Sequence, residues 1–361
     1  MNSSPQVSGL VGSGSGRRVQ SVHSRAPLRL GLAGGGTDVA PYSDLYGGQV
    51  LNATISLFTH CHLTLVDDGF VNFTADDFAE TIRLPLAAAY ETQGGLVLHK
   101  AVYNRVVRQF NDGRPLPVRM TTYSDAPPGS GVGSSSTLVV AMVQAYAELL
   151  QLPLGEYDVA HLAYEIERVD CAMSGGKQDQ YAATFGGFNF IEFGAGDRVV
   201  VNPLRLKRDR ANELESRLML YYTGRSRESA RIIESQIEAT KAANGEAIEA
   251  MHRIRQGATE MKEALLKGHI STVLDILGAS WHIKKRAAAG ISNSHIDEIA
   301  AAAMAGGARG LKISGAGGGG FMMIAVDPDT RYSVVRALTP FGGRVFSFNF
   351  VEQGAQAWTN T

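Results

Sequence analysis

The sequence of 361 residues has little cysteine, no long apolar run and no excess of charge of either sign. Its two cysteines, Cys61 and Cys171, stand far apart and outside any Cys-x-x-Cys pattern, which excludes a disulfide framework and a zinc ribbon. No stretch approaches the roughly 18 apolar residues that a membrane-spanning helix needs. Lys and Arg number 34 and Asp and Glu 35, and this balance argues against a general nucleic-acid binder. We therefore expect a soluble, cytoplasmic globular protein without a nucleic-acid or membrane partner.

The length suits about two domains, at roughly 150 residues each. Residues 1–21 are rich in Ser and Gly and lack the apolar segment of a secretory signal, so we expect a disordered leader there. Beyond it, strand-like and helix-like segments mix irregularly, which indicates an α+β fold. We place the domain boundary so that an N-terminal domain spans 22–195 and a C-terminal domain spans 196–361.

Local patterns predict individual elements. Alternating apolar residues predict strands at 28–32, 48–56, 58–66 and 69–75, which we expect to form an antiparallel meander, and a last strand at 345–354. Apolar residues at helical spacing predict a helix over 97–110, a buried helix from about Ser134, long amphipathic helices between 225 and 289, and a helix at 294–305. We interpret the basic run at 284–286 as a solvated helix face.

Glycine, in contrast, is abundant, with 41 residues, and three loops that are rich in it carry candidate chemistry. The central loop reads PPGSGVGSSST at 127–137 and leads directly into the buried helix. Its glycines free the backbone to curl around a ligand, and the helix start adds N–H donors and the positive end of a dipole. Serine hydroxyls can also ligate Mg²⁺. The pattern favours a phosphate cradle, with a Ser-capped turn that binds nothing as the alternative.

The central loop does not match two well-known nucleotide motifs. It lacks the Gly-Lys-Ser/Thr of a Walker A loop, and no acidic residue follows at the ribose distance of a Rossmann fingerprint. The His-Arg-Asp and Asp-Phe-Gly sets of protein kinases are absent as well.

Two further glycine loops carry candidate chemistry. In SGGKQDQ at 174–180, Asp179 can accept a proton from a substrate hydroxyl, although a turn-capping role is the alternative. Upstream, Glu165 and Glu167 lie on a helical stretch, and one of them could reach a metal. The third loop, SGAGGGG at 314–320, lies between two predicted apolar strands and has more glycine than the turn of a hairpin needs. We expect another backbone or a ligand against it, with a mobile connector as the alternative.

Three motifs in a fixed order support a family resemblance: APLRLGLAGGGTD at 26–38, PPGSGVGSSS at 127–136 and SGAGGGG at 314–320. With them, the chain resembles the GHMP kinases, small-molecule kinases named after galactokinase, homoserine kinase, mevalonate kinase and phosphomevalonate kinase. The resemblance covers residues 25–352. It implies a two-domain α+β GHMP kinase fold with the active site in the interdomain cleft, and ATP and Mg²⁺ as cofactors.

The family pattern, carried over residue by residue, implies a catalytic pair and a metal site. Asp179 matches the aspartate that takes or orients the proton of the acceptor hydroxyl, and Arg29 matches the cation that pairs with it. Such a cation keeps the aspartate ionised and stabilises developing charge. Ser135 and Glu167 match the Mg²⁺ ligands, with Ser134 left open as an alternative to Ser135.

The remaining implied roles concern ATP and the sugar. Asp38 and Gly36 match positions that contact the substrate, the central loop holds the ATP phosphates, and the third loop closes over the site. The phosphate-binding residues are Gly129, Gly131, Gly133, Ser134, Ser135 and Ser136, and those of the closing loop are Gly315, Gly317 and Gly318.

The first motif also bears on the sugar. Galactokinases carry Gly-Glu-His before Thr-Asp, whereas this chain has three glycines at 34–36, which disfavours galactose. The wider phrase is similar to the sugar-1-kinase branch. This implies phosphorylation of the anomeric C1 hydroxyl of D-glycero-D-manno-heptose 7-phosphate to the 1,7-bisphosphate, for GDP-heptose biosynthesis. The alternatives are a kinase for a free sugar such as fucose, or a catalytically silent sugar- and ATP-binding regulator.

A substrate that already carries a phosphate needs cations around that phosphate. Lys177, Arg225 and Arg227 are the candidates, with solvated or nucleotide-side charges as the alternative. The sequence leaves the oligomeric state open.

Overall fold

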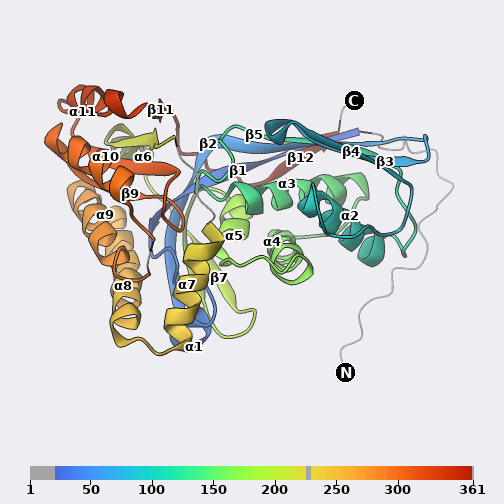
Figure 1. The fold of residues 1–361 in the computed structure, drawn as a ribbon, viewed down its shortest axis with the longest axis horizontal. Helices are drawn as coiled ribbons and strands as arrows, with labels where there is room; N and C mark the ends of the chain where they lie inside the picture. The colour runs from blue at the N-terminus through green and yellow to red at the C-terminus, as the bar shows by residue number, and fades with distance from the viewer. Residues whose placement is uncertain (1–20, 225–228, 289, 360–361) are drawn as a thin grey trace.

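The computed structural model describes residues 21–224, 229–288 and 290–359. Within these residues, helices and strands mix along the chain, which confirms the α+β expectation (Figure 1). Three short turns, η1 (Asp76–Phe78), η2 (Ile166–Asp170) and η3 (Thr339–Phe341), accompany the α-helices. The α-helices are α1 (Tyr42–Tyr46), α2 (Val97–Phe110), α3 (Ser134–Leu149), α4 (Glu156–Glu165), α5 (Gln178–Phe185), α6 (Arg208–Ser216), α7 (Ser229–Lys241), α8 (Gly245–Lys267), α9 (Ile270–Lys284), α10 (Ser294–Ala305) and α11 (Arg331–Leu338).

The larger sheet joins eight strands of the described residues. Its main path runs β12–β1–β2–β5–β3–β4, and β6 pairs with both β2 and β7 beside that path. The strands are β1 (Ser21–Ala33), β2 (Gly48–Leu65), β3 (Phe70–Ala75), β4 (Glu80–Pro85), β5 (Val118–Ser124), β6 (Phe188–Phe193), β7 (Val199–Pro203) and β12 (Gln356–Thr359).

The smaller sheet joins four strands of the described residues in the order β11–β8–β10–β9, all antiparallel to their neighbours. Its β9–β10 hairpin carries the third glycine loop, so the predicted order of strand, glycine turn and strand is confirmed. The strands are β8 (Leu218–Tyr222), β9 (Ala308–Ile313), β10 (Phe321–Val326) and β11 (Arg344–Phe346).

The two longest strands, β1 and β2, bring the first motif to the centre of the molecule. The runs predicted separately at 48–56 and 58–66 form the single strand β2, which pairs with β6 in its first half and with β5 in its second. Along β1, the register against β2 shifts between Pro27 and Arg29 and again between Gly31 and Ala33. Such irregularities bend a strand and redirect side chains. They flank Arg29 on both sides.

The expected meander is wrong. Strand β5 lies between β2 and β3, and β3 pairs with it in parallel, with Phe73 opposite Met120. Both of these side chains are buried, so the inserted strand completes an apolar face that a local hairpin would leave open. The predicted last strand at 345–354 is also wrong. Its residues split between β11 in the small sheet and an irregular segment that leads to β12 in the large one, because one straight strand cannot pair in both sheets.

The helices cover the sheets where their apolar faces predict. The helix over 97–110 and the helix that begins at Ser134 are confirmed as α2 and α3, and α3 packs across β1 and β2. The amphipathic region consists of α7, α8 and α9. In Figure 1 the small sheet and α9 to α11 lie at one end, β3 to β5 with α2 lie at the other, and β1, β2, α5 and α7 pass through the middle.

A shared hydrophobic core holds the two sheets together. One cluster of buried side chains joins Leu30 of β1 and Leu51 of β2 to Leu220 of β8 and Met261 of α8. Burying a leucine-sized side chain stabilises a fold by about 1.5–3 kcal/mol. The cluster therefore fixes the position of β1 relative to the small sheet, and with it the geometry of the cleft between them.

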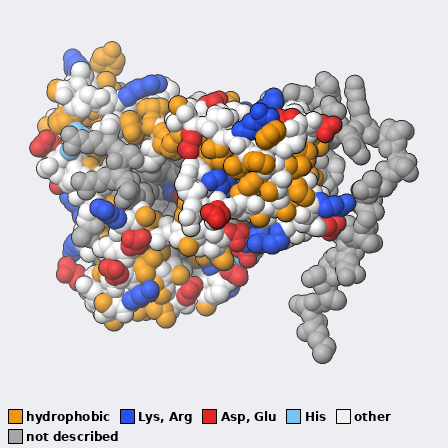
Figure 2. Space-filling model, turned by 45° about the vertical axis from the view of Figure 1, so that its right-hand side comes forward, with side chains coloured by type: hydrophobic (Ala, Val, Ile, Leu, Met, Phe, Trp, Pro, Cys, Tyr) orange, Lys and Arg blue, Asp and Glu red, His pale blue; other side chains and the backbone are white. Residues whose placement is uncertain are grey.

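The outer surface and the chain ends add three observations. No helix among the described residues is long and apolar enough to cross a bilayer. On the face shown in Figure 2, basic and acidic side chains are interspersed, in keeping with the net charge of −1. Of the predicted leader, residues 1–20 lie outside the described residues and Ser21 is the first residue of β1.

The domain boundary at 195/196 stays a prediction. Beyond it, β7 and β12 return to the large sheet.

Candidate active site

A cleft of about 620 Å³ lies where the three glycine loops meet. Its walls come from β1 and the loop after it, the loop before α3, the turn between η2 and α5, and α7. Lys284 of α9 and Lys312 of β9 complete the lining together with the start of the third glycine loop. Segments from both sheets therefore build one cavity.

The loop before α3 has the form of an anion-binding site. Gly131 and Gly133 have φ of +80° and +82°, a conformation that side chains rarely adopt. Gly133 is the N-cap of α3, and because glycine has no side chain it makes no capping hydrogen bond to the first helical turn. The first turn therefore keeps its N–H donors and the positive end of the helix dipole for a ligand. Gly129, Gly131, Gly133 and the serines at 134–136 all line the cleft.

The third glycine loop packs directly on the central one. A Cβ on Gly315 would lie 2.6 Å from the carbonyl oxygen of Gly131, so only glycine permits this approach. Farther along, Gly318 donates its backbone N–H to Ile291 O at 2.9 Å, and a Cβ on Gly317 would lie 2.8 Å from the same oxygen. The expectation that another backbone lies against this loop is confirmed. Of its three predicted site residues, Gly315 lines the cleft.

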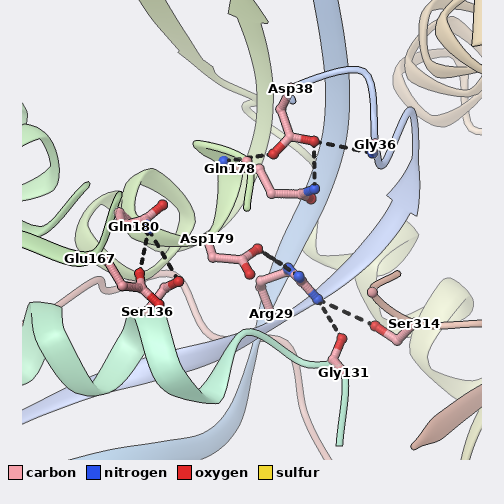
Figure 3. A network of polar contacts seen from close by, with 12 residues as sticks. Arg29, Gly36, Asp38, Gly131, Ser136, Glu167, Gln178, Asp179, Gln180 and Ser314 are labelled. Atoms are coloured by element: carbon pink, nitrogen blue, oxygen red, sulfur yellow. Dashed lines mark hydrogen bonds and ion pairs between the residues drawn. The ribbon is translucent and has the colours of Figure 1, made fainter. Parts of the chain in front are cut away.

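Arg29 and Asp179 form an ion pair at the centre of the cleft (Figure 3). Arg29 places Nε 2.7 Å and Nη2 2.6 Å from Asp179 Oδ1. Its Nη1 donates to Gly131 O at 2.8 Å and to Ser314 Oγ at 3.4 Å, which ties the pair to both glycine loops. The arginine is 4% exposed and the aspartate 20%. A carboxylate with this exposure, held by a buried cation, can accept a proton from a group in the cleft.

Glu167 lies on η2, a short π-helical turn of a kind that often occurs at functional sites. The carboxylate is buried, and it accepts hydrogen bonds from Ser135 Oγ at 2.8 Å and Gln180 Nε2 at 2.7 Å. Arg168 Nη2 lies 3.5 Å from the same group. The structure thus brings Ser135 and Glu167 together. Glu165 pairs instead with Arg105 at 2.6 Å and does not line the cleft.

Asp38 lies beside Asp179 and is held rigidly. Its carboxylate accepts the backbone N–H of Gln178 at 3.0 Å, Gln178 Nε2 at 2.9 Å and the backbone N–H of Gly36 at 3.1 Å (Figure 3). Burial, with the nearby Asp179, raises the pKa of Asp38. Gln178 Oε1 is buried and has no hydrogen-bond partner among the described residues. It is an acceptor available to a ligand, and the sequence motifs did not single it out.

The predicted cations for the phosphate of the sugar do not gain support from the structure. Lys177 points away from the cleft, since its Nζ donates to Gly196 O at 2.6 Å and lies over the Tyr164 ring. Arg225 and Arg227 lie outside the described residues, so their part in the site stays a prediction.

The interpretation of the 284–286 run as solvated is wrong for its first member. Lys284 is 7% exposed and lines the cleft. Its position was visible in the sequence, because Leu277, Trp281 and Lys284 follow one stripe of α9 and both apolar members of that stripe are buried. Lys312, 4% exposed, had no such signal.

Two family profiles match the chain, "GHMP kinases N terminal domain" over residues 97–187 and "GHMP kinases C terminal" over residues 261–343. The D-glycero-alpha-D-manno-heptose 7-phosphate kinase of Campylobacter jejuni is 47% identical over 340 residues, 94% of this chain and 99% of that protein. A crystal structure of a D-glycero-D-manno-heptose 1-phosphate kinase from Bacteriodes thetaiotaomicron is 44% identical, with a TM-score of 0.80 over 94% of this chain and 99% of that one.

A second solved structure, a putative sugar kinase from Campylobacter jejuni, is 46% identical, with a TM-score of 0.79 over 96% of this chain and 100% of that one. These similarities extend over nearly the whole chain. The predicted two-domain α+β fold is therefore the GHMP kinase fold, and the chemistry is phosphoryl transfer to an alcohol. The chain belongs to the GHMP kinase family.

Proposed function

We propose that this enzyme transfers the γ-phosphoryl group of ATP to the anomeric C1 hydroxyl of D-glycero-D-manno-heptose 7-phosphate. The product, a 1,7-bisphosphate, would serve the synthesis of GDP-heptose. The observation that carries the proposal is the Arg29–Asp179 pair, which lies in one cleft with the uncapped start of α3. The names of both similar proteins support a heptose, and one of them supports a phosphate at position 7.

The proposed step uses the pair at the acceptor. The C1 oxygen attacks the γ-phosphorus, a new O–P bond forms, and the bond from phosphorus to the β,γ-bridging oxygen breaks to leave ADP. The hydroxyl proton passes to the Asp179 carboxylate, and Arg29 stabilises the negative charge that develops nearby. Catalysis then rests on positioning and charge neutralisation, as is general for phosphoryl transfer.

The residues around α3 suit ATP and Mg²⁺. The N–H donors of the first turn would hold phosphate oxygens, and Ser135 with Glu167 would hold the metal. Ser134 Oγ is buried without a hydrogen-bond partner among the described residues, which leaves a further oxygen ligand at the same place. The described residues contain no group of three or more His, Cys, Asp or Glu side chains that could form a closed cage. Mg²⁺ typically takes one or two protein oxygens plus substrate phosphates. When bound, it neutralises part of the phosphate charge.

The other half of the cleft suits a sugar. The Asp38 carboxylate and the unpartnered Gln178 Oε1 are acceptors for hydroxyl groups, and Gly36 presents its backbone beside them. Helix α7 closes this region, since Gln236 Nε2 donates to Gly36 O at 2.8 Å. Buried polar groups of this kind reject substrates that lack the matching hydroxyl, and they therefore favour specificity.

The names of the two similar proteins differ in the phosphate that their substrates carry. Transfer to C1 requires a free anomeric hydroxyl, so a heptose 1-phosphate cannot be its substrate. ADP release should therefore be measured with Mg·ATP and heptose 7-phosphate, heptose 1-phosphate, free heptose, fucose, galactose or mevalonate. Of these compounds, we expect only heptose 7-phosphate to be turned over. The ³¹P spectrum of the product should show a new phosphate at C1 beside the one at C7. Turnover with fucose instead would show that the substrate is a free sugar and not heptose 7-phosphate. Binding of a sugar without turnover would indicate a silent regulator.

Replacing Glu167 by glutamine tests the metal site. The amide keeps the shape of the carboxylate but removes its charge, so we expect the Mg²⁺ concentration for half-maximal activity to rise about 10- to 100-fold. Glu165→Gln is the matched control two residues away, because Glu165 pairs with Arg105 outside the cleft. A Mg²⁺ titration at fixed ATP reads both variants. Equal Mg²⁺ dependence in Glu167→Gln and the unmodified enzyme would remove Glu167 from the metal site.

A further inference from the structure

Two buried lysines in the cleft have no part in the step described above. Lys284 is the last residue of α9 and Lys312 lies on β9, and they are 7% and 4% exposed. Among the described residues, their ammonium groups contact only backbone carbonyls. Lys284 Nζ donates to Gly315 O, and Lys312 Nζ donates to Gly31 O at 2.8 Å and Leu32 O at 3.2 Å.

Neither lysine forms an ion pair with a carboxylate of the described residues. Asp179, the carboxylate at the centre of the cleft, is already paired with Arg29. Burial and Arg29 lower the pKa of Lys284 to about 8, against an opposing effect of Asp38. Burial, followed by Lys284 and Arg29, lowers the pKa of Lys312 well below its usual range. A buried cation without an anionic partner is destabilising, and an anion bound in the cleft removes that cost.

Hydrogen bonding points the same way. An ammonium group has three N–H donors. Lys284 uses one of them on Gly315 O and Lys312 uses two on β1, so donors remain on both. Because both residues line the cleft, these donors are available to a ligand there.

The position of Lys284 identifies which anion it would meet. Its partner Gly315 packs against Gly131 of the phosphate-binding loop, and Gly131 O in turn accepts a hydrogen bond from Arg29. Lys284 is therefore next to the junction of the nucleotide loop and the catalytic pair. In an in-line transfer, the migrating phosphoryl group lies between the nucleotide and the acceptor oxygen. That junction is where it must pass.

We propose that Lys284, with Lys312 beside it, binds the oxygens of the phosphoryl group that is transferred. The inference rests on the proposed kinase step and adds a second cation to Arg29 in that step. The lysine makes no covalent bond. Its ammonium donates hydrogen bonds to the phosphoryl oxygens and neutralises their charge, while Lys312 holds the adjacent backbone of β1. A phosphate already carried by the sugar is the other source of the same chemistry.

Nucleotide binding without sugar separates these two sources. The melting temperature of the unmodified enzyme should be measured with Mg·ADP and with the Mg complex of a non-hydrolysable ATP analogue. We expect the analogue to add stabilisation beyond ADP, and Lys284→Met to lose that addition while keeping the response to ADP. Lys285→Met is the matched control, because Lys285 is the exposed neighbour and lies 3.6 Å from Asp297 at the surface. It should behave like the unmodified enzyme.

Steady-state kinetics provides the second readout. We expect Lys284→Met to lower kcat by about 10²- to 10³-fold, with the KM for the sugar phosphate changed less than about threefold. Lys284→Arg should recover part of kcat, because it restores the charge with different geometry. Without ligands, Lys284→Met should melt at the same temperature as the unmodified enzyme or higher, since a buried uncompensated charge has been removed.

Three results would overturn the inference. A raised KM for the sugar phosphate, with kcat and the analogue response retained, would assign the lysine to the phosphate of the sugar. A much lower melting temperature without ligand would make it a structural residue. Equal responses to ADP and the analogue in the unmodified enzyme would place the γ-phosphate elsewhere. If the proposed sugar is wrong, the unmodified enzyme will not turn over heptose 7-phosphate, and the nucleotide measurements will still test Lys284.

Discussion

Replacing Asp179 by asparagine is expected to lower kcat by about 10²- to 10⁴-fold while the protein keeps its fold and its affinity for ADP. The amide cannot accept the proton of the acceptor hydroxyl, and it leaves the buried Arg29 guanidinium without its counter-charge. The Asp179 side chain packs against Gly133, and a Cβ on Gly133 would lie 3.1 Å from Asp179 Cγ. The amide of asparagine has the same shape as the carboxylate, so we expect the loop before α3 to stay in place. Single-turnover ADP formation with heptose 7-phosphate measures the loss.

A double-mutant comparison shows whether Asp179 acts on the proton or only through Arg29. We expect the double variant Arg29→Met/Asp179→Asn to have a kcat about tenfold or more below that of Arg29→Met alone, because proton transfer to Asp179 does not require the ion pair. No further loss would mean that the aspartate acts only by holding the arginine. Asp112→Asn, at an exposed turn where Asp112 pairs with Arg114, is the control that should leave kcat unchanged.

Replacing Gly131 by alanine is expected to destabilise the protein by roughly 2–4 kcal/mol and to abolish measurable ATP binding. Gly131 has φ of +80°, and a Cβ there would lie 2.6 Å from Ser314 O. The atoms it would meet all belong to the backbone, so the two glycine loops must move apart, and the N–H groups before α3 and the Arg29 contacts move with them. Urea unfolding gives the free energy of unfolding, and nucleotide titration gives the affinity.

Gly113→Ala isolates the backbone part of that effect. Gly113 has φ of +70°, but a Cβ at this position would meet no atom within 4 Å. We expect the alanine to cost about 1 kcal/mol from its left-handed backbone and to leave activity unchanged. If both alanine variants lose the same stability and both keep ATP binding, the close approach of the two loops is not the reason why position 131 requires glycine.

Local patterns predicted the elements of the fold better than their order. Helical periodicity predicts helix α2 and the start of α3, and apolar strands around a glycine turn predict the β9–β10 hairpin. Each of these signals is local, because the residues that make it up are close together in the sequence. The meander failed because strand neighbours are chosen by the surfaces they bury. The apolar side of β3 is completed by β5, which arrives in the chain only after α2.

The sequence by itself determined the chemistry available to this protein: a carboxylate and a cation in recognisable motifs, and glycines where the backbone must turn tightly. Only the tertiary structure decided which groups meet. Arg29 and Asp179, 150 residues apart, touch because β1 and α5 face the same cleft. Likewise, Lys177 turns away while Lys284 and Lys312 turn in. The sequence shows that a lysine can carry a charge, but it does not show whether that lysine is buried, because the segments that bury it come from distant parts of the chain.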